Sequence, residues 1–213
     1  MSVLAPGVIF RLLDGPKAIA RGDGDLLALP ADSGPGDGEV AAQEYARQFR
    51  VWRRQPGFAL AEAMHGGFVV GYAAGLPLRP SSSWWRDVTT RLPEAVSTEH
   101  PGRTFAVMTL VVRAAWRRQG IGTQLHTLLL AGRPEERATL TAGPQAAAQA
   151  ALRAWGWSKV ARTRAANSGL RDIYLLSPLP NVPFRSSLDS RPGLPLTPGP
   201  PMAATASGHR PAG

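Results

Sequence analysis

The stretch Met108–Leu130, MTLVVRAAWRRQGIGTQLHTLLL, limits the possible folds of this chain more than any other. It opens with an apolar run that is typical of a strand and closes with a leucine-rich run that is typical of a helix. Between these runs stand Gly120 and Gly122, which lack a Cβ, so the backbone can turn tightly there and a ligand can approach it closely. The pattern predicts a strand, a sharp turn and a helix that begins near Gly120.

This turn is a candidate anion site. The first N–H groups of a helix have no partners within the helix and lie at the positive end of its macrodipole, so together they bind an anion. Arg117 and Arg118 stand just before the glycines. They either add charge-assisted hydrogen bonds to the anion or are simply solvent-exposed side chains at the edge of the turn. We expect a ligand that carries phosphate; an ordinary strand-to-helix turn is the simpler alternative.

The order and spacing of the motif resemble a known signature. Leu110-Val111-Val112, followed by R-x-x-G-x-G over 117–122, resembles the acetyl-CoA signature of the GNAT superfamily of N-acetyltransferases. Other phosphate-binding motifs fit less well, because no Gly-Lys-Ser/Thr follows the loop and no G-x-G-x-x-G is present with its acidic partner. The segment LRAWGW, residues 152–157, also lies where the superfamily often has a tyrosine, three residues and Gly-Phe. The resemblance implies an α/β fold with a GNAT-like mixed, mostly antiparallel central sheet and helices on both faces.

The resemblance also implies acetyl-CoA as co-substrate. It implies that the amides around 118–123 hold the pyrophosphate and that the pantetheine arm pairs like an added strand with 110–112. The residues thereby assigned to the cofactor are Leu110, Val111, Val112, Arg117, Arg118, Gln119, Gly120, Ile121, Gly122 and Thr123.

The catalytic groups usual in this superfamily are missing. Direct attack by an amine on a thioester needs a neutral amine, a donor for the oxyanion and a proton donor for the leaving thiolate. Leu152 stands where many members have the donating tyrosine, and Met108 and Thr109 stand where many have a carboxylate. The catalytic residues are therefore left unassigned, and ordered water is one candidate base. The remaining polar candidates are Glu62, Glu94, Glu99, His100 and Tyr174.

The rest of the chain predicts a regular order of elements. Turn chemistry and periodicity predict a strand at 7–15, a loop at 31–40, a helix at 41–55 and a hairpin at 58–78 that turns at 65–67. A long polar connection over 80–103 follows, then a strand at 103–113, a helix at 120–132, a strand at 136–143, a helix at 144–155 and strands at 156–164 and 171–179. Within the connection, Trp84 and Trp85 are either aromatic walls of the substrate site or plugs that anchor the loop.

Composition excludes several classes of site. The 213 residues include no cysteine, which excludes disulfides, thiolate nucleophiles and cysteine-ligated metals, and the four histidines show no metal-ligand spacing. The net charge of +9 comes mainly from arginines spread along the chain, so we expect no nucleic-acid partner. The sequence lacks a long apolar run and a signal-peptide pattern, which predicts a cytoplasmic protein without a membrane partner.

The two parts of the chain differ in composition. Nine of the 20 prolines fall within 178–213, so we predict a GNAT-like domain over 1–178 and a disordered proline-rich tail over 179–213. The predicted function is transfer of an acetyl group from acetyl-CoA to the primary amine of a small molecule. The alternatives are a protein or peptide acceptor and a catalytically weak acyl-CoA-binding module; edge-strand pairing into a homodimer also stays open.

Overall fold

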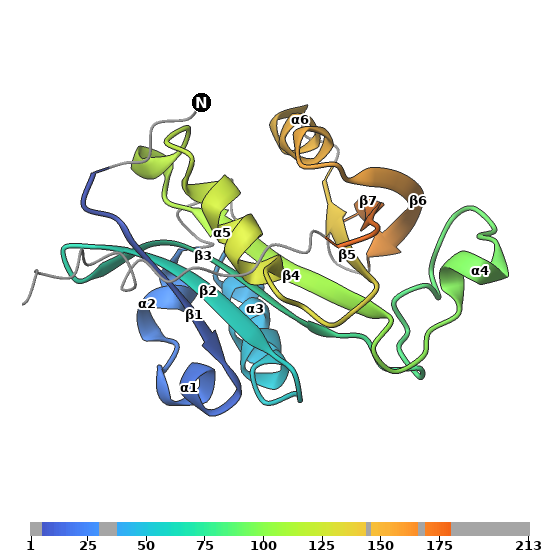
Figure 1. The fold of residues 1–213 in the computed structure, drawn as a ribbon, viewed down its shortest axis with the longest axis horizontal. Helices are drawn as coiled ribbons and strands as arrows, with labels where there is room; N and C mark the ends of the chain where they lie inside the picture. Colours follow the sequence, from blue (N-terminus) through green and yellow to red (C-terminus); the bar gives the residue numbers. More distant parts are fainter. Residues whose placement is uncertain (1–5, 30–37, 144–145, 166–168, 180–213) are drawn as a thin grey trace, which may run out of the picture.

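The computed structural model describes residues 6–29, 38–143, 146–165 and 169–179. Within them, seven strands form one sheet in the order β1-β2-β3-β4-β5-β7-β6 (Figure 1). Only the β4–β5 pair is parallel, so the predicted mixed, mostly antiparallel sheet is confirmed. The elements in chain order are β1 (Ile9–Asp14), α1 (Gly15–Ala20), α2 (Gly24–Ala28), α3 (Gly38–Trp52), β2 (Ala59–His65), β3 (Phe68–Pro77), α4 (Glu94–Ser97), β4 (Thr104–Val112), η2 (Ala114–Trp116), α5 (Ile121–Leu130), β5 (Arg137–Ala142), α6 (Ala146–Ala154), β6 (Ser158–Ala165) and β7 (Gly169–Leu176).

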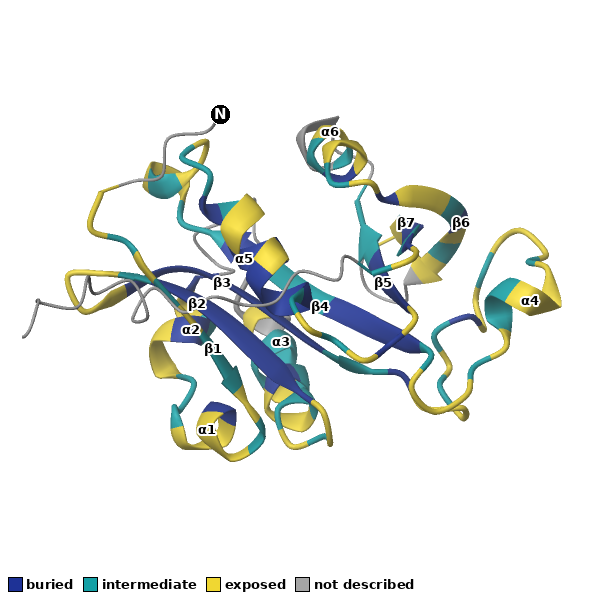
Figure 2. Ribbon diagram, in the orientation of Figure 1, coloured by how far each residue is buried: buried dark blue, intermediate teal, exposed yellow. Residues whose placement is uncertain are grey.

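Helices cover both faces of the sheet. Helix α5 buries Ile121, Leu125 and Leu129 against β1 to β4, and α6 joins the same apolar cluster through Leu152. We call this side the α5 face. Helices α1, α2 and α3 pack on the opposite side, which we call the α3 face (Figures 1 and 2).

The aromatic stripe of α3 faces the sheet as the spacing predicts. Phe49 is fully buried, and Tyr45 and Trp52 are partly buried beside it in one cluster with Tyr72. The loop predicted up to residue 40 is wrong in its last part, because α3 already begins at Gly38. The stripe marks the packed turns of a helix and carries no signal for its first turn; residues 31–37 of that loop lie outside the described part of the chain.

The predicted hairpin is confirmed between β2 and β3. Gly66 and Gly67 have φ values of 55° and 85°, the left-handed backbone that a tight two-residue turn needs. The pairing then runs from His65 and Phe68 along both strands. The predicted tail over 179–213 lies outside the described residues except for Leu179, which packs against the cluster on the α5 face.

Candidate functional site

Strands β4 and β5 separate part of the way along their length. Their parallel pairing runs from Thr104 and Arg137 to Val107 and Leu140, and no pairing is described beyond that point. From Met108 onward β4 continues to Val112 beside β3 alone, after a register shift between Ala74 and Gly75 of β3 that leaves Met108 as an extra residue of β4. Backbone N–H and C=O groups of β4 that point towards β5 therefore face a gap.

A cavity of about 390 Å³ occupies this gap. Its walls come from β4 at 107–110, from the end of β5 at 140–143, and from α5, α6 and β7. Most of the lining is apolar or backbone, and the polar side chains in it are Thr109, His126, Thr141 and Arg171. The sequence patterns predict no role for His126, Thr141 or Arg171.

The turn before α5 lies next to the cavity. Gly120 caps the helix with φ 75°, and Arg118 also has a positive φ of 63°. The first amide with a helical partner is that of Gln124, which donates to the Gly120 carbonyl at 3.1 Å. The amides that precede it therefore lie at the positive end of α5, as the sequence pattern predicts.

Gly122 has a different backbone conformation from Gly120. A Cβ at this position would meet Leu110, Val112 and Trp155 only at 3.7–3.9 Å, which is ordinary contact, and the residue already belongs to α5. Of the two glycines, only Gly120 has the left-handed backbone, which strains residues that carry a Cβ. Gly122 instead leaves room between β4, α5 and α6.

The predicted cofactor residues form one continuous segment from β4 to α5. Leu110 and Val112 pack on the α5 face, and Val111 is buried on the α3 face. Arg117 Nε donates to the Val112 carbonyl at 3.0 Å, and Gln119 Nε2 donates to the Ala115 carbonyl at 3.1 Å. Thr123 Oγ1 accepts from Trp155 Nε1 at 3.3 Å, and Ile121 is buried. Their assignment to acetyl-CoA stays a prediction.

His126 is a neutral imidazole in the cavity wall. Its Nε2 accepts a hydrogen bond from Trp157 Nε1 at 2.9 Å, and its ring stacks on Trp155 with centroids 4.6 Å apart. Burial lowers the pKa of His126 to about 4. A neutral ring that accepts at Nε2 carries its proton on Nδ1, so the network assigns this tautomer. His126 thus provides an N–H donor beside Leu152, which has none.

A cluster of hydroxyls stands at the strand position where a carboxylate is missing. Tyr45 Oη and Tyr72 Oη lie 2.6 Å apart, and both interact with the Thr109 hydroxyl. Burial raises the pKa of Tyr45 and of Tyr72, so both phenols stay protonated at neutral pH. These hydroxyls can orient a polar group, but they cannot act as a base in the way that a carboxylate does.

The matching family profile is that of the Acetyltransferase (GNAT) family, over residues 25–157. The chain belongs to the GNAT acetyltransferase family. The match includes the turn before α5 and ends at Trp157, so it covers the main walls of the cavity. A search of curated protein sequences found no match.

Solved structures of GNAT acetyltransferases have the same fold. Aminoglycoside 6'-acetyltransferase type Ii aligns with a TM-score of 0.54 and 17% identity, over 81% of this chain and 99% of its own. The ribosomal-protein-S18-alanine N-acetyltransferase from Escherichia coli gives 0.53 and 12%, over 81% and 94%. A GNAT family acetyltransferase from Elizabethkingia anophelis with acetyl-CoA bound gives 0.51 and 12%, over 81% and 99%. At these identities the likeness concerns the fold alone.

Glu62 has a structural environment. Its side chain is fully buried on β2, where it accepts from Arg11 Nε at 2.6 Å and also pairs with Arg21 at the end of α1. Because Arg21 also pairs with Asp25 of α2, this carboxylate ties both short helices to the sheet. Glu62 does not line the cavity between β4 and β5.

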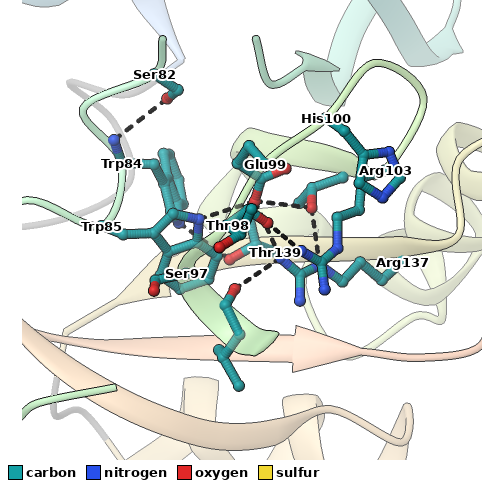
Figure 3. A network of polar contacts seen from close by, with 12 residues as sticks. Ser82, Trp84, Trp85, Ser97, Thr98, Glu99, His100, Arg103, Arg137 and Thr139 are labelled. Carbon is teal, nitrogen blue, oxygen red and sulfur yellow. Dashed lines mark hydrogen bonds and ion pairs between the residues drawn. The ribbon is translucent and has the colours of Figure 1, made fainter. Parts of the chain in front are cut away.

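The two tryptophans of the long connection are anchored to the sheet (Figure 3). Trp85 Nε1 donates to Glu99 at 2.8 Å, and Arg137 Nη2 donates to the same carboxylate at 3.0 Å. Trp84 Nε1 donates to Thr139 Oγ1 at 3.1 Å. These contacts match the plug interpretation, and neither indole is among the side chains that line the cavity. A direct substrate contact for Trp84 and Trp85 stays a prediction.

The other polar candidates do not line the cavity. Glu94 is exposed at the start of α4, and His100 is exposed with its Nε2 3.6 Å from Glu136. Tyr174 is buried in the cluster on the α5 face. In the described part of the chain, no group of three metal-ligating side chains is found, and no helix is long and apolar enough to span a membrane.

Proposed function

We propose that the protein transfers an acetyl group from acetyl-CoA to the primary amine of a small molecule. The observation that carries this proposal is the cavity between β4 and β5, which adjoins the first turn of α5, since Leu110 and Trp155 line the cavity and also flank Gly122. Its volume of about 390 Å³ lies in the lower part of the range for small-molecule sites. This size favours a small acceptor over a protein segment.

The residues present fit acetyl-CoA, which would supply the activated acetyl group as a thioester. The left-handed backbone at Arg118 and Gly120 is of the kind that lets successive amides of a turn bind an anion, which suits a pyrophosphate. The edge of β4 beyond Val107 offers backbone groups to an extended arm. Gly122 leaves room between β4 and α6.

The proposed reaction develops negative charge at two places in the cavity, on the acetyl oxygen and on the leaving sulfur. As the amine nitrogen bonds to the acetyl carbon, an oxyanion develops, and backbone N–H groups of β4 that face the gap can stabilise it. The carbon–sulfur bond then breaks, and the departing thiolate takes the proton that the amine loses, through water. The Nδ1–H of His126 can hydrogen-bond this thiolate in place of the tyrosine absent at Leu152.

Equilibrium binding and turnover together test the proposal. Titration calorimetry should detect one acetyl-CoA per chain, and a thiol-release assay over a panel of amines should show CoA release that depends on the amine, with the acetylated amine found by mass spectrometry. A reaction without amine controls for hydrolysis. Binding without turnover of any amine would favour the acyl-CoA-binding module, and turnover of peptides alone would favour a protein acceptor.

A further inference from the structure

Arg171 reaches the cavity from the α3 face. Side chains alternate along a strand, and Ile173 and Leu175 of β7 pack with Trp85 on that face, whereas Tyr174 packs on the α5 face. Arg171 lies two residues before Ile173, so it shares the side of Ile173 while lining the cavity. It therefore approaches the gap from the side opposite α5 and α6.

The guanidinium is fixed by neutral groups only. Arg171 Nε donates to Thr141 Oγ1 and Arg171 Nη2 donates to the Thr141 carbonyl, both at 3.2 Å. Among the described residues, no carboxylate forms an ion pair with Arg171. The neighbouring Asp172 is paired instead with Lys159 and Arg162, each at 2.8 Å.

This arrangement leaves a half-buried positive charge at the wall of the cavity. Burial lowers the pKa of Arg171, although a guanidinium remains protonated in proteins. A cation that has lost water without gaining a counter-charge interacts strongly with an anion that enters the same cavity. Arginine is suited to carboxylates in particular, because its planar fork matches their two oxygens.

A second polar group faces the gap from β4. Val111 packs on the α3 face, so Thr109, two residues earlier, lies on that face as well, where its hydroxyl meets Tyr45 and Tyr72. The α3 side of the cavity thus has Thr109 on one wall and Arg171 on another.

We propose that the acceptor amine carries a carboxylate, as an amino acid does, and that Arg171 binds this carboxylate while the amine lies towards Thr109. The inference rests on the proposed function and specifies its substrate class. Arg171 could also bind a carboxylate on the acyl group of the thioester donor. The position of Arg171 on the α3 face favours a carboxylate on the acceptor instead.

Paired acceptors test the proposal. The kcat/KM with acetyl-CoA is compared for amino acids and their amides: glycine and glycinamide, β-alanine and β-alaninamide, 4-aminobutanoate and 4-aminobutanamide. The wild-type protein should prefer the carboxylate of at least one pair by about tenfold or more. R171Q should lose this preference and keep its acetyl-CoA Kd, and R171K should retain part of it. R164Q, which removes the same charge at an exposed position of β6 outside the cavity, should behave like wild type.

Two further measurements separate the possible causes of failure. Calorimetry of each of the three amino acids with CoA-loaded protein should show binding of at least one that R171Q loses, so the carboxylate site is tested even if no amine turns over and the proposed function fails. A comparison of succinyl-CoA with acetyl-CoA as the donor tests whether Arg171 instead binds a carboxylate on the acyl group. The proposal is overturned if R171Q keeps the preference for amino acids, if wild type has none, or if R171Q affects only succinyl-CoA. The melting temperature of R171Q must match that of wild type within a few degrees. If it does not, the carboxylate preference of R171K, compared with that of wild type, decides.

Discussion

Two features constrain the residue at position 120: the left-handed backbone of Gly120 and its place at the positive end of α5. Its φ of 75° is unfavourable for any residue with a Cβ, and its position caps α5 at the positive end of the helix. Gly120→Ala should therefore weaken acetyl-CoA binding moderately through strain. Gly120→Glu adds a negative charge beside the expected pyrophosphate and should raise the Kd by about a further tenfold or more. Calorimetry at two salt concentrations measures both variants.

The difference between the two variants isolates the charge. The excess loss in Gly120→Glu should shrink at high salt, because screening weakens repulsion between exposed charges. Equal affinities for the alanine and glutamate variants would place the phosphate elsewhere, and wild-type affinity in both would refute the site.

His126 should make the stability of the fold depend on pH. Its pKa is about 4 in the folded protein, below the ordinary value near 6.5, so between these pH values the unfolded chain binds more protons. The free energy of unfolding should then fall as the pH is lowered through this window, by about 2 kcal/mol from pH 7 to pH 5 for this group. Urea unfolding at both pH values measures the loss.

Matched histidine variants assign the effect. H126Q retains an acceptor for Trp157 Nε1 but cannot be protonated, so its unfolding free energy should change less between pH 7 and pH 5 than that of wild type. H100Q changes a half-exposed surface histidine and should keep the wild-type dependence. Identical pH profiles for H126Q and wild type would show that His126 is not held neutral by burial.

At the scale of elements, the separation of β4 from β5 coincides with the register shift between β3 and β4 beside Gly75. A Cβ on Gly75 would lie 2.5 Å from the Ala106 carbonyl and 2.5 Å from the Phe105 ring, and the first of these is backbone that cannot move aside. Gly75→Ala should therefore destabilise the protein by several kcal/mol, on the order of the largest single-site effects. Thermal unfolding measures the change.

Gly24→Ala is the control for this substitution. Gly24 opens α2 without a positive φ, and nothing lies within 4 Å of an added Cβ, so the melting temperature should stay the same or rise slightly. A Gly75→Ala protein that melts like Gly24→Ala would show that β3 and β4 can shift apart at this point.

The elements that the sequence predicts are those with a local signal. Gly66 and Gly67 predict a hairpin, and the spacing of Tyr45 and Phe49 predicts a packed helix. Both predictions succeed because the pattern and the structure it predicts occupy the same few residues. Helices α1, α2 and α4 span only six, five and four residues, too few for a helical period to appear.

From the sequence, only the part of the candidate site that is expected to bind the cofactor can be predicted. The turn at Gly120 is a contiguous motif, whereas the state of His126 depends on Trp157, 31 residues away in the chain. Arg171 is likewise fixed by Thr141, 30 residues before it. Which face of the sheet each side chain takes follows from the register of β5 and β7, and a single sequence does not encode that register locally.

At the scale of the whole molecule, the cavity joins the two faces of the sheet. His126, Leu152 and Trp155 line it from the side of α5 and α6, and Thr109 and Arg171 line it from the α3 face. A donor that lies along β4 beside α5 therefore leaves the opposite side open to an acceptor. Both substrates can occupy the gap together.

This arrangement predicts a sequential reaction without an acetylated enzyme. The chain has no cysteine, the Nε2 lone pair of His126 is occupied by Trp157, and the Thr141 hydroxyl is bound by Arg171. None of these side chains is free to accept the acetyl group, so under the proposed function we expect the amine to attack the thioester directly. Initial rates measured over a grid of acetyl-CoA and amine concentrations should give intersecting double-reciprocal lines. Intact-protein mass spectrometry after incubation with acetyl-CoA alone should show no added acetyl group; parallel lines together with a stoichiometric acetyl adduct would instead demand a covalent intermediate.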